Sequence, residues 1–179
     1  MVTGPEFSHV VKLADIGSGA THVKLVTDEG QRNALAGRFD LLSLSSLDAD
    51  LAVSREARGI LAEGRIKATL EQACIATGDP VPAVIDEPAR VLFIPEPAHA
   101  ADSEVELDAD DCDMMFHDGQ GVDLGEAVAQ SLGLSLDPYP RSANAEAALK
   151  QAGVISEEGA NRESSPFGAL ASLRDKLKK

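Results

Sequence analysis

The chain has 179 residues, of which 44% are hydrophobic, and a formal net charge of −14 at pH 7. It is long enough for one domain with a buried core plus additional segments. No apolar run approaches the roughly 20 residues of a membrane-spanning helix, which argues against a membrane protein. The opening MVTGPEFSHVV lacks the basic start and apolar stretch of an export signal, and the two cysteines form no CxxC pair. We therefore expect a protein of the reducing cytoplasm.

The negative charge is concentrated in one segment. Residues 1–98 carry 9 basic and 14 acidic side chains, residues 99–140 carry 0 and 11, and residues 141–179 carry 7 and 5. An RNA-binding domain usually has a basic surface, so the charge of the whole chain argues against one. The uneven distribution weakens that objection, because the charges nearly balance outside the acidic segment.

The first 40 residues predict two short strands and a helix. An apolar stretch at 10–13 starts the first strand, and the alternation over 20–27 predicts the second. Asp28 is followed three residues later by Gln31, which is the spacing of a capping box at the start of a helix. Gly37 is the expected end of this helix.

The middle of the chain carries the longest alternating pattern. Every second residue is apolar from 47 to 53, and the same alternation continues with few exceptions from 60 to 74. This pattern predicts antiparallel strands with one buried face. The leucines before Ser45 have the opposite parity, which predicts a β-bulge near Ser45 and Ser46.

The pattern is less regular after Pro80. A further strand is expected to reach Ile94, but Pro82 and Pro88 lack the N–H that a central strand needs. They predict an edge position or irregular pairing. Residues 99–112 are rich in alanine and acidic side chains, so we expect a solvated, mobile linker there.

Residues 113–141 are expected to complete the same domain as residues 1–98. Met114 to Phe116 predict a short strand, and Asp123 with Glu126 has the spacing of a second capping box. The helix that follows should bury one apolar stripe. This stripe consists of Leu124, Ala127, Val128, Ser131 and Leu132.

The remaining residues, 142–179, predict a loose tail that is poorly ordered up to 164. Ser165 and Pro166 then start a terminal amphipathic helix. Its docking stripe comprises Phe167, Leu170, Leu173 and Leu177. The whole pattern predicts an α+β fold: a curved antiparallel β-sheet, a packed helix after Asp123 and a loosely attached C-terminal helix.

Common signatures of catalysis and metal binding are missing from the sequence. It contains no GxxxxGK[ST] phosphate loop, no HExxH and no GxSxG, and its four histidines are scattered. If Asp108 were the first residue of an EF-hand loop, the loop would need glycine at position 113 and glutamate at position 119. The chain has Asp113 and Gly119 there, so the match fails. We therefore expect no catalytic residues, no metal and no cofactor.

Cys74 shares the apolar face of its strand with Ile66 and Leu70. We expect its thiol to be buried, reduced and inert, with a pKa that burial raises. A thiol reagent should label it slowly in the native protein, and labelling should not change binding.

A contact with RNA or with a protein partner is the remaining candidate site. Its candidate residues are Arg55, Arg58, Arg65, Lys67, Tyr139 and Arg141. The first four lie in a turn and on the outward face of the next strand. One interpretation is that they contact phosphates, and the other is that they form an ordinary charged face with nearby glutamates. The last two lie in a Pro-Tyr-Pro-Arg turn that offers RNA a ring and a cation, or simply ends the preceding helix.

Three blocks of the sequence resemble the YceD family of large-ribosomal-RNA accumulation proteins. The first is ACIATGDPVPAVIDEPARVLFIPE, the second runs from Asp123 to Arg141, and the third is Pro166-Phe167 with the leucines that follow. Their order and spacing hold over most of the chain. Thr77 stands where some relatives carry a second cysteine, and Ala89 stands where an aromatic residue is expected.

The resemblance implies a non-enzymatic bacterial factor linked to the accumulation or processing of large-subunit ribosomal RNA. Its partners would be that RNA or a basic ribosomal protein, with neither membrane nor DNA involved. The alternative is an acidic adaptor that binds protein and has no direct RNA contact. We further expect Tyr139 and Arg141 to join the four other basic candidates in one RNA-facing surface.

Overall fold

The computed structural model describes residues 5–17, 19–96 and 113–154. Within them, one sheet has the strand order β2-β3-β4-β5-β6 and a second pairs β1 with β7. The strands are β1 (Val10–Lys12), β2 (Thr21–Val26), β3 (Leu41–Glu56), β4 (Gly59–Ala73), β5 (Pro80–Pro95), β6 (Asp113–His117) and β7 (Gly121–Asp123). The helices are α1 (Glu29–Arg38), α2 (Leu124–Ser135) and α3 (Ala145–Gln151), with a short 3-10 helix η1 (Leu13–Asp15). The α+β prediction is confirmed, since the larger sheet is mostly antiparallel and does not close into a barrel.

The described chain divides into two compact units. Unit 1 lies within residues 1–72 and 80–138 and contains both sheets with α1 and α2. Unit 2 lies within residues 73–79 and 139–179 and contains the turn after β4 together with α3. The expected linker at 99–112 lies outside the described residues. So does the expected terminal helix, with its stripe of Phe167, Leu170, Leu173 and Leu177.

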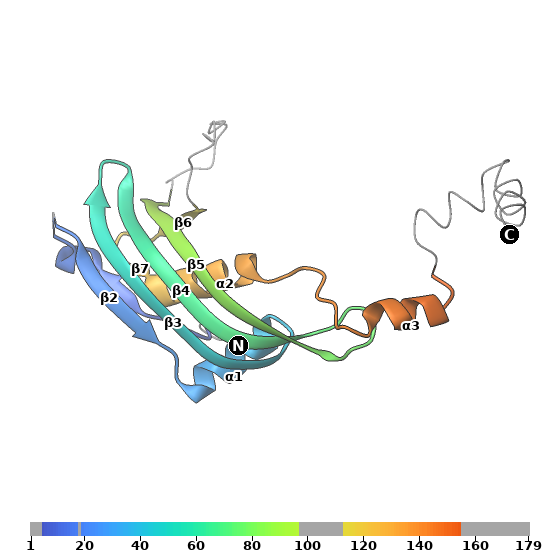
Figure 1. Cartoon of the computed structure of the whole chain (residues 1–179). Coiled ribbons are helices and arrows are strands. Elements are labelled where there is room, and N and C mark those ends of the chain that lie inside the picture. Colours follow the sequence, from blue (N-terminus) through green and yellow to red (C-terminus); the bar gives the residue numbers. More distant parts are fainter. Residues whose placement is uncertain (1–4, 18, 97–112, 155–179) are drawn as a thin grey trace, which may run out of the picture. The chain divides into compact units, whose positions relative to one another are not determined.

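The long hairpin of β3 and β4 forms the centre of unit 1 (Figure 1). The alternating apolar residues at 47–53 and at 60–70 are buried on one face, as predicted, and Leu61 of the opposite parity is buried as well. The pairing register shifts between Leu44 and Ser46, which confirms the expected bulge. A second shift, between Leu41 and Ser43, had no signal in the sequence.

Helix α1 begins with the predicted capping box. The Gln31 N–H donates to the Asp28 carboxylate at 2.8 Å, and the Asp28 N–H donates to the Gln31 side chain at 2.9 Å. The expected stop at Gly37 is wrong by one residue, because the helix continues to Arg38 and Phe39 caps it. Asp40 then turns the chain with φ of 53°, a left-handed conformation that aspartate tolerates better than most residues.

Helix α2 lies along one face of the bent sheet (Figure 1). All five residues of its predicted stripe are buried. Asp123 caps the helix, accepting from the N–H groups of Gly125 at 3.0 Å and Glu126 at 3.2 Å. The capping box itself is not formed, because the Glu126 side chain binds Arg38 instead.

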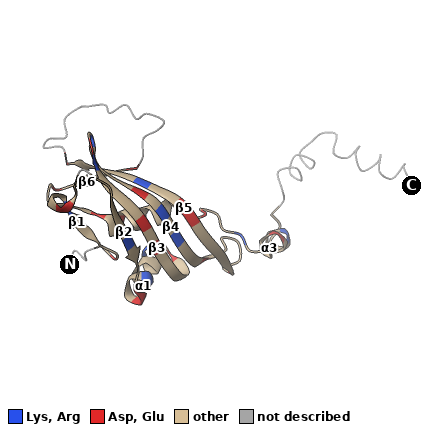
Figure 2. Ribbon diagram, turned by 60° about the vertical axis from the view of Figure 1, so that its left-hand side comes forward, with Lys and Arg blue, Asp and Glu red and all other residues tan. Residues whose placement is uncertain are grey.

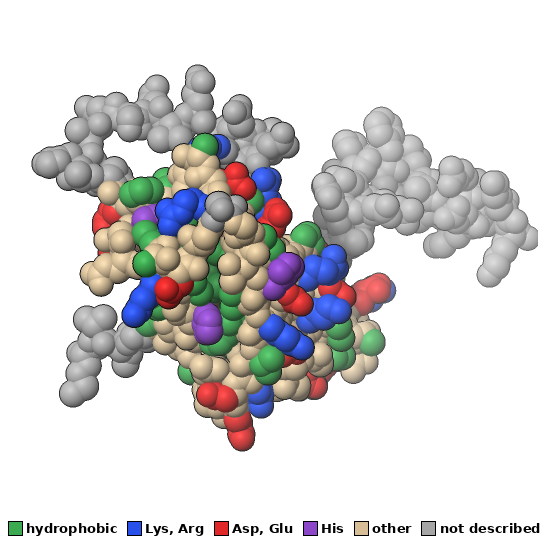
Figure 3. Space-filling view, turned by 90° about the vertical axis from the view of Figure 1, so that its left-hand side faces the viewer, with side chains coloured by type: hydrophobic (Ala, Val, Ile, Leu, Met, Phe, Trp, Pro, Cys, Tyr) green, Lys and Arg blue, Asp and Glu red, His purple; other side chains and the backbone are tan. Residues whose placement is uncertain are grey.

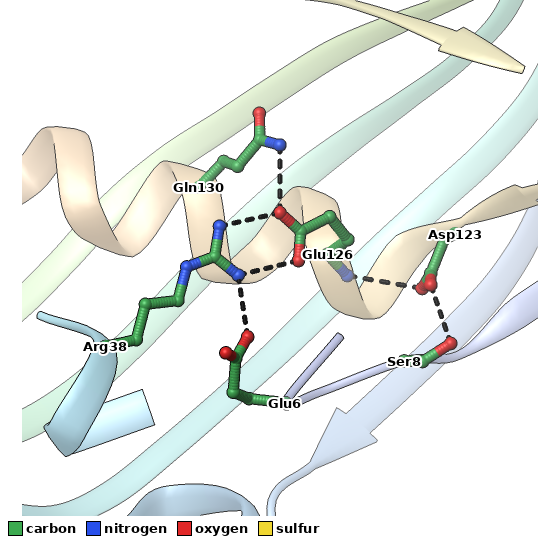
Figure 4. Close-up of polar contacts among 6 residues, drawn as sticks. All are labelled: Glu6, Ser8, Arg38, Asp123, Glu126 and Gln130. Carbon is green, nitrogen blue, oxygen red and sulfur yellow. Dashed lines mark hydrogen bonds and ion pairs between the residues drawn. The ribbon is translucent and has the colours of Figure 1, made fainter. Parts of the chain in front are cut away.

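Arg38 joins three segments of unit 1 (Figure 4). Its guanidinium donates two bonds to Glu126, at 2.7 and 2.8 Å, and one to Glu6, at 3.1 Å. The Glu126 bond raises the pKa of Arg38, and Arg38 lowers the pKa of Glu126. Since Gln130 also donates to Glu126, this bidentate pair fixes the end of α1 against the first turns of α2.

Strand β6 confirms the strand expected around Met115, but it runs parallel to β5. It pairs only with residues 91–95 of that strand. Pro82 and Pro88 lie in the part of β5 that β6 does not reach. Their missing N–H groups are therefore tolerated, as expected of an edge position.

Helix α3 corrects the expectation of poor order for residues 145–151, whereas residues 155–164 of the same expected stretch lie outside the described residues. Its sequence AEAALKQ consists of strong helix formers, and Lys150 lies 2.6 Å from Glu146 one turn earlier. The Asn144 side chain makes no capping bond, so the helix depends on propensity more than on a cap.

Candidate functional site

Charged residues of both signs occur along strands β2 to β5 (Figure 2). We call the surface that they form on one side of the sheet the charged face. It consists of Lys24, Asp48, Asp50, Glu63, Arg65, Lys67, Asp86 and Arg90. Alternation produces it, because most residues between these side chains have the opposite direction, with Leu25, Ala49, Ile66 and Ala89 buried in the core.

The registers place opposite charges side by side across the strands. Lys24 lies opposite Asp50, which lies opposite Arg65 on the next strand. In the neighbouring row, Asp48 lies opposite Lys67. Opposite charges at such positions stabilise a sheet by a fraction of a kcal/mol, roughly 0.2–1 per pair.

Asp86 binds both cations that sequence analysis placed on this face. Arg65 donates to the Asp86 carboxylate at 2.8 Å and to its backbone oxygen at 2.7 Å, and Lys67 lies 3.6 Å from the same carboxylate. The Arg65 bond lowers the pKa of Asp86. These side chains are 50–64% exposed. A charged group of a partner can therefore replace Asp86 in either ion pair at little cost in free energy.

A hollow of about 560 Å³ opens in the middle of the charged face. It is lined by Lys24, Val26, Asp48, Ala49, Asp50, Gly64, Arg65 and Lys67. Within the described part of the chain, neither Asp48 nor Asp50 makes a hydrogen bond or ion pair. Val26 beside them is 63% exposed. The hollow thus combines two carboxylates and the Lys24 ammonium, which make no ion pair among the described residues, with an apolar rim.

The other predicted contact residues are engaged or lie elsewhere. Arg55 donates to the carbonyls of Leu13 at 2.8 Å and Ile16 at 3.5 Å, which ties η1 to the hairpin. Arg58 also has an interaction partner. Tyr139, which is 70% exposed, and Arg141 belong to unit 2. Their place beside Arg65 stays a prediction.

Cys74 is buried as predicted, with 3% of its surface exposed, but the expected direction of its pKa is wrong. The backbone N–H of Ser142 and then the Thr77 hydroxyl stabilise the thiolate and lower the thiol pKa to about 6. Thr77 and Ser142 also bond to Asp79, at 2.9 and 3.2 Å. The Thr-Gly-Asp turn just after the cysteine was the available signal for the Thr77 donor, and Ser142 had none.

This geometry predicts that alkylation of Cys74 titrates with a midpoint near pH 6 instead of the usual 9. Thr77→Val removes one donor and should move the midpoint upward, whereas Thr77→Ser keeps the hydroxyl and should not. Because the folded pKa is depressed, the thiolate's contribution to stability is present above the unfolded pKa and is lost as pH falls through about 6. The pH dependence of iodoacetamide labelling checks this, and a midpoint near 9 in the wild type would contradict it.

Among the described residues, no group of three or more His, Cys, Asp or Glu side chains is arranged to hold a metal ion. None of the helices in this part of the chain has the length and apolar character needed to cross a bilayer.

The family model of YceD, described as large ribosomal RNA subunit accumulation protein YceD, matches residues 62–174. This match covers β4 from residue 62 onward and all of β5 and α2, and with them Arg65, Lys67 and Asp86 of the charged face. Neither a curated protein nor a solved structure matches the chain significantly. Since the match covers more than half of its length, the chain belongs to the YceD family.

Proposed function

We propose that this protein supports the accumulation of large-subunit ribosomal RNA by binding a basic ribosomal protein through its charged face, without catalysing a reaction. One observation carries the choice of partner. In the hollow, the Asp48 and Asp50 carboxylates and the Lys24 ammonium make no ion pair among the described residues, whereas Arg65 and Lys67 are held by the Asp86 carboxylate. Among the groups of the hollow that make no ion pair, carboxylates therefore outnumber cations by two to one.

The charge of the whole molecule supports the same partner. The net charge of −14, of which −11 lies in residues 99–140, attracts a basic protein over distances of about a Debye length and repels the phosphates of RNA. Ion pairs at the rim of such a contact contribute more to association rate and specificity than to affinity. The family membership supplies the setting, ribosomal RNA accumulation, and we place the protein in the bacterial cytoplasm.

Direct RNA binding is the second candidate, because Arg65 and Lys67 lie side by side on an exposed strand. A phosphate would have to replace the Asp86 carboxylate on both cations. The two candidates therefore predict opposite effects when the carboxylate of Asp86 is removed.

Asp86→Asn tests the choice of partner. If the partner is a basic protein, losing one negative charge should weaken binding by about three- to tenfold. If the partner is RNA, the same change frees two cations, so RNA binding should strengthen and fall more steeply with salt. The measurement is the affinity for purified large-subunit proteins and, separately, for large-subunit ribosomal RNA, at two salt concentrations.

Glu87→Gln is the matched control. It removes the same charge from the neighbouring exposed residue, which makes no hydrogen bond or ion pair within the described chain. An equal loss of protein binding in both variants would show that binding depends on the net charge of the protein and not on the place of Asp86 in the charged face. Stronger RNA binding by Asp86→Asn alone would overturn the protein partner in favour of RNA.

A further inference from the structure

The charges of the charged face alternate in sign from strand to strand. In one row across the sheet, Lys24 lies opposite Asp50, and Asp50 lies opposite Arg65. Arg65 in turn binds Asp86 at 2.8 Å. The order is thus positive on β2, negative on β3, positive on β4 and negative on β5. Figure 3 faces the side of unit 1 on which β2 lies, and acidic and basic side chains intermingle there.

The next row has the same signs on β3 and β4, with a valine on each outer strand. Val26 lies opposite Asp48, and Asp48 lies opposite Lys67. Ion pairs between positions 65 and 86 and between positions 63 and 90 show that β4 and β5 run antiparallel. Val84 of β5 therefore comes level with Lys67. Both valines are unusually exposed for apolar side chains, Val26 at 63% and Val84 at 79%.

The two rows carry equal numbers of cations and carboxylates. The cations are Lys24, Arg65 and Lys67, and the carboxylates are Asp48, Asp50 and Asp86. Two of the cations share Asp86, while the other three groups make no ion pair among the described residues. A partner of one sign would meet a like charge at three of these six positions. The best complement is a surface that has both signs in the reverse order.

A second copy of the chain presents such a surface. A two-fold axis parallel to the strands, above the line between β3 and β4, would place β3 of each copy over β4 of the other and β2 over β5. Because rotation about this axis keeps each row level, every charged residue of the two rows faces one of opposite sign. The facing pairs are Asp50 with Arg65, Asp48 with Lys67, and Lys24 with Asp86. Facing sheets cross at about 30°, so the match is closest for β3 and β4, which lie next to the axis.

The same axis brings the exposed valines together and fills the hollow. Val26 of each copy faces Val84 of the other, so both apolar side chains leave water. Arg65 and Lys67 of the second copy lie above the hollow of about 560 Å³ that β2, β3 and β4 line. Their long side chains enter it above Gly64, which has no side chain of its own.

From this self-complementary pattern we infer that the charged face binds a second copy of the chain, face to face, about a two-fold axis parallel to the strands. The inference goes beyond the proposed function, because it describes the protein without its ribosomal partner. Asp48 and Asp50 serve both contacts, so the dimer and the complex with a basic protein exclude each other.

The size of the face makes this dimer a weak one. A third row adds area but no free charge pair, since Glu63 and Arg90 lie 3.8 Å apart within one copy. Four strands about 4.8 Å apart and three rows about 7 Å apart give a footprint roughly 20 Å square, or about 400 Å² per copy. Stable interfaces bury about 800 Å² per partner. We therefore expect a monomer–dimer equilibrium with a Kd in the micromolar range or weaker.

Sedimentation equilibrium of two complementary variants tests the inference. Asp48→Lys places a lysine opposite Lys67 of the second copy, and Lys67→Asp places an aspartate opposite Asp48, twice in each dimer. Each variant alone should self-associate at least tenfold more weakly than the wild type. Mixed one to one, the two should form a heterodimer with a Kd within about threefold of the wild-type value. Each contact between positions 48 and 67 then again joins a lysine and an aspartate.

The net charge of −14 opposes the association of two copies, so the salt concentration matters. At an ionic strength of about 0.15 M, charges more than about 8 Å apart are largely screened, and the facing pairs are not. Asp48→Lys also makes the chain less negative, so net charge alone predicts stronger association where the face predicts weaker association. Mixing leaves the pairing within each chain unchanged, so restored association reports the contact between copies.

Glu29→Lys and Lys12→Asp are the matched control pair. They make the same changes of charge on exposed residues of α1 and β1. Alone or mixed, they should leave the Kd within about twofold of the wild-type value. Circular dichroism checks that each variant folds. Asp50→Lys with Arg65→Asp is the second pair if a member of the first does not fold, because these positions also face each other.

A wild-type chain that stays monomeric up to about 1 mM would overturn the inference. So would a dimer that the reversals do not weaken, or a mixture that stays monomeric. If no dimer forms, yet Asp86→Asn weakens the ribosomal-protein contact and Glu87→Gln does not, the proposed function stands without the dimer. If mixing restores the dimer, yet ribosomal proteins bind Asp86→Asn as they bind the wild type, the dimer stands and the proposed function fails.

Discussion

Replacing Gly64 with alanine should lower the free energy of unfolding by about 3 kcal/mol or more. A Cβ at this position would overlap the carbonyl oxygen of Asp50 and lie 2.9 Å from its carbonyl carbon. Both obstacles are backbone atoms of the paired strand, so no side chain can move aside. The overlap can be relieved only if β3 and β4 separate in the middle of the long hairpin, where Gly64 pairs with Leu51.

Urea unfolding followed by circular dichroism measures this effect. Gly19→Ala is the control, because a Cβ there meets nothing within 4 Å. Equal stability of the two variants would show that the strands are not held as close as the structure has them. Because Gly64 lines the hollow, a folded Gly64→Ala variant should also show altered binding at the charged face.

The second large effect is expected at Gly125, in the first turn of α2. A Cβ there would lie 2.7 Å from the His9 nitrogen and 2.8 Å from both the Phe7 oxygen and the Ser8 carbonyl carbon. Gly125→Ala should therefore push this N-terminal segment off the helix. The bonds from Ser8 and His9 to the Asp123 carboxylate, at 2.6 and 2.8 Å, would be lost. Phe7, which is 4% exposed, would lose its cover.

We expect a loss of about 2–4 kcal/mol from Gly125→Ala, even though alanine is the better helix former. Gly37→Ala is the matched control, since it is also helical and has open space around its Cβ. That change should raise stability by up to about 1 kcal/mol. If both substitutions stabilise the protein, the close packing of the N-terminal segment on α2 is wrong.

Local patterns in the sequence predicted most of unit 1 correctly. The alternation at 47–53 marked the buried face of β3, and the parity change before Ser45 marked the bulge. Asp28 with Gln31 and Asp123 both marked helix starts. These signals depend on residues within a few positions of one another, so one sequence suffices to interpret them.

Interactions between distant segments were beyond such patterns. Glu126 has the spacing of a capping-box partner, yet it binds Arg38, which is 88 positions away. Cys74 has the parity of an inert core thiol, yet Ser142 lowers its pKa. The parallel pairing of β6 had no signal either, because a five-residue strand indicates neither its neighbour nor its direction.

The sequence by itself determined the family and the outward direction of Arg65 and Lys67, because motif order and strand parity are properties of the linear chain. Only the tertiary structure decided that these cations form ion pairs with Asp86 while the carboxylates of Asp48 and Asp50 form none among the described residues. Which charges meet across a sheet depends on strand order, register and bulges together. A different strand order, a one-residue shift in register or a different bulge would each exchange the charged partners. No local pattern in the sequence specifies all three.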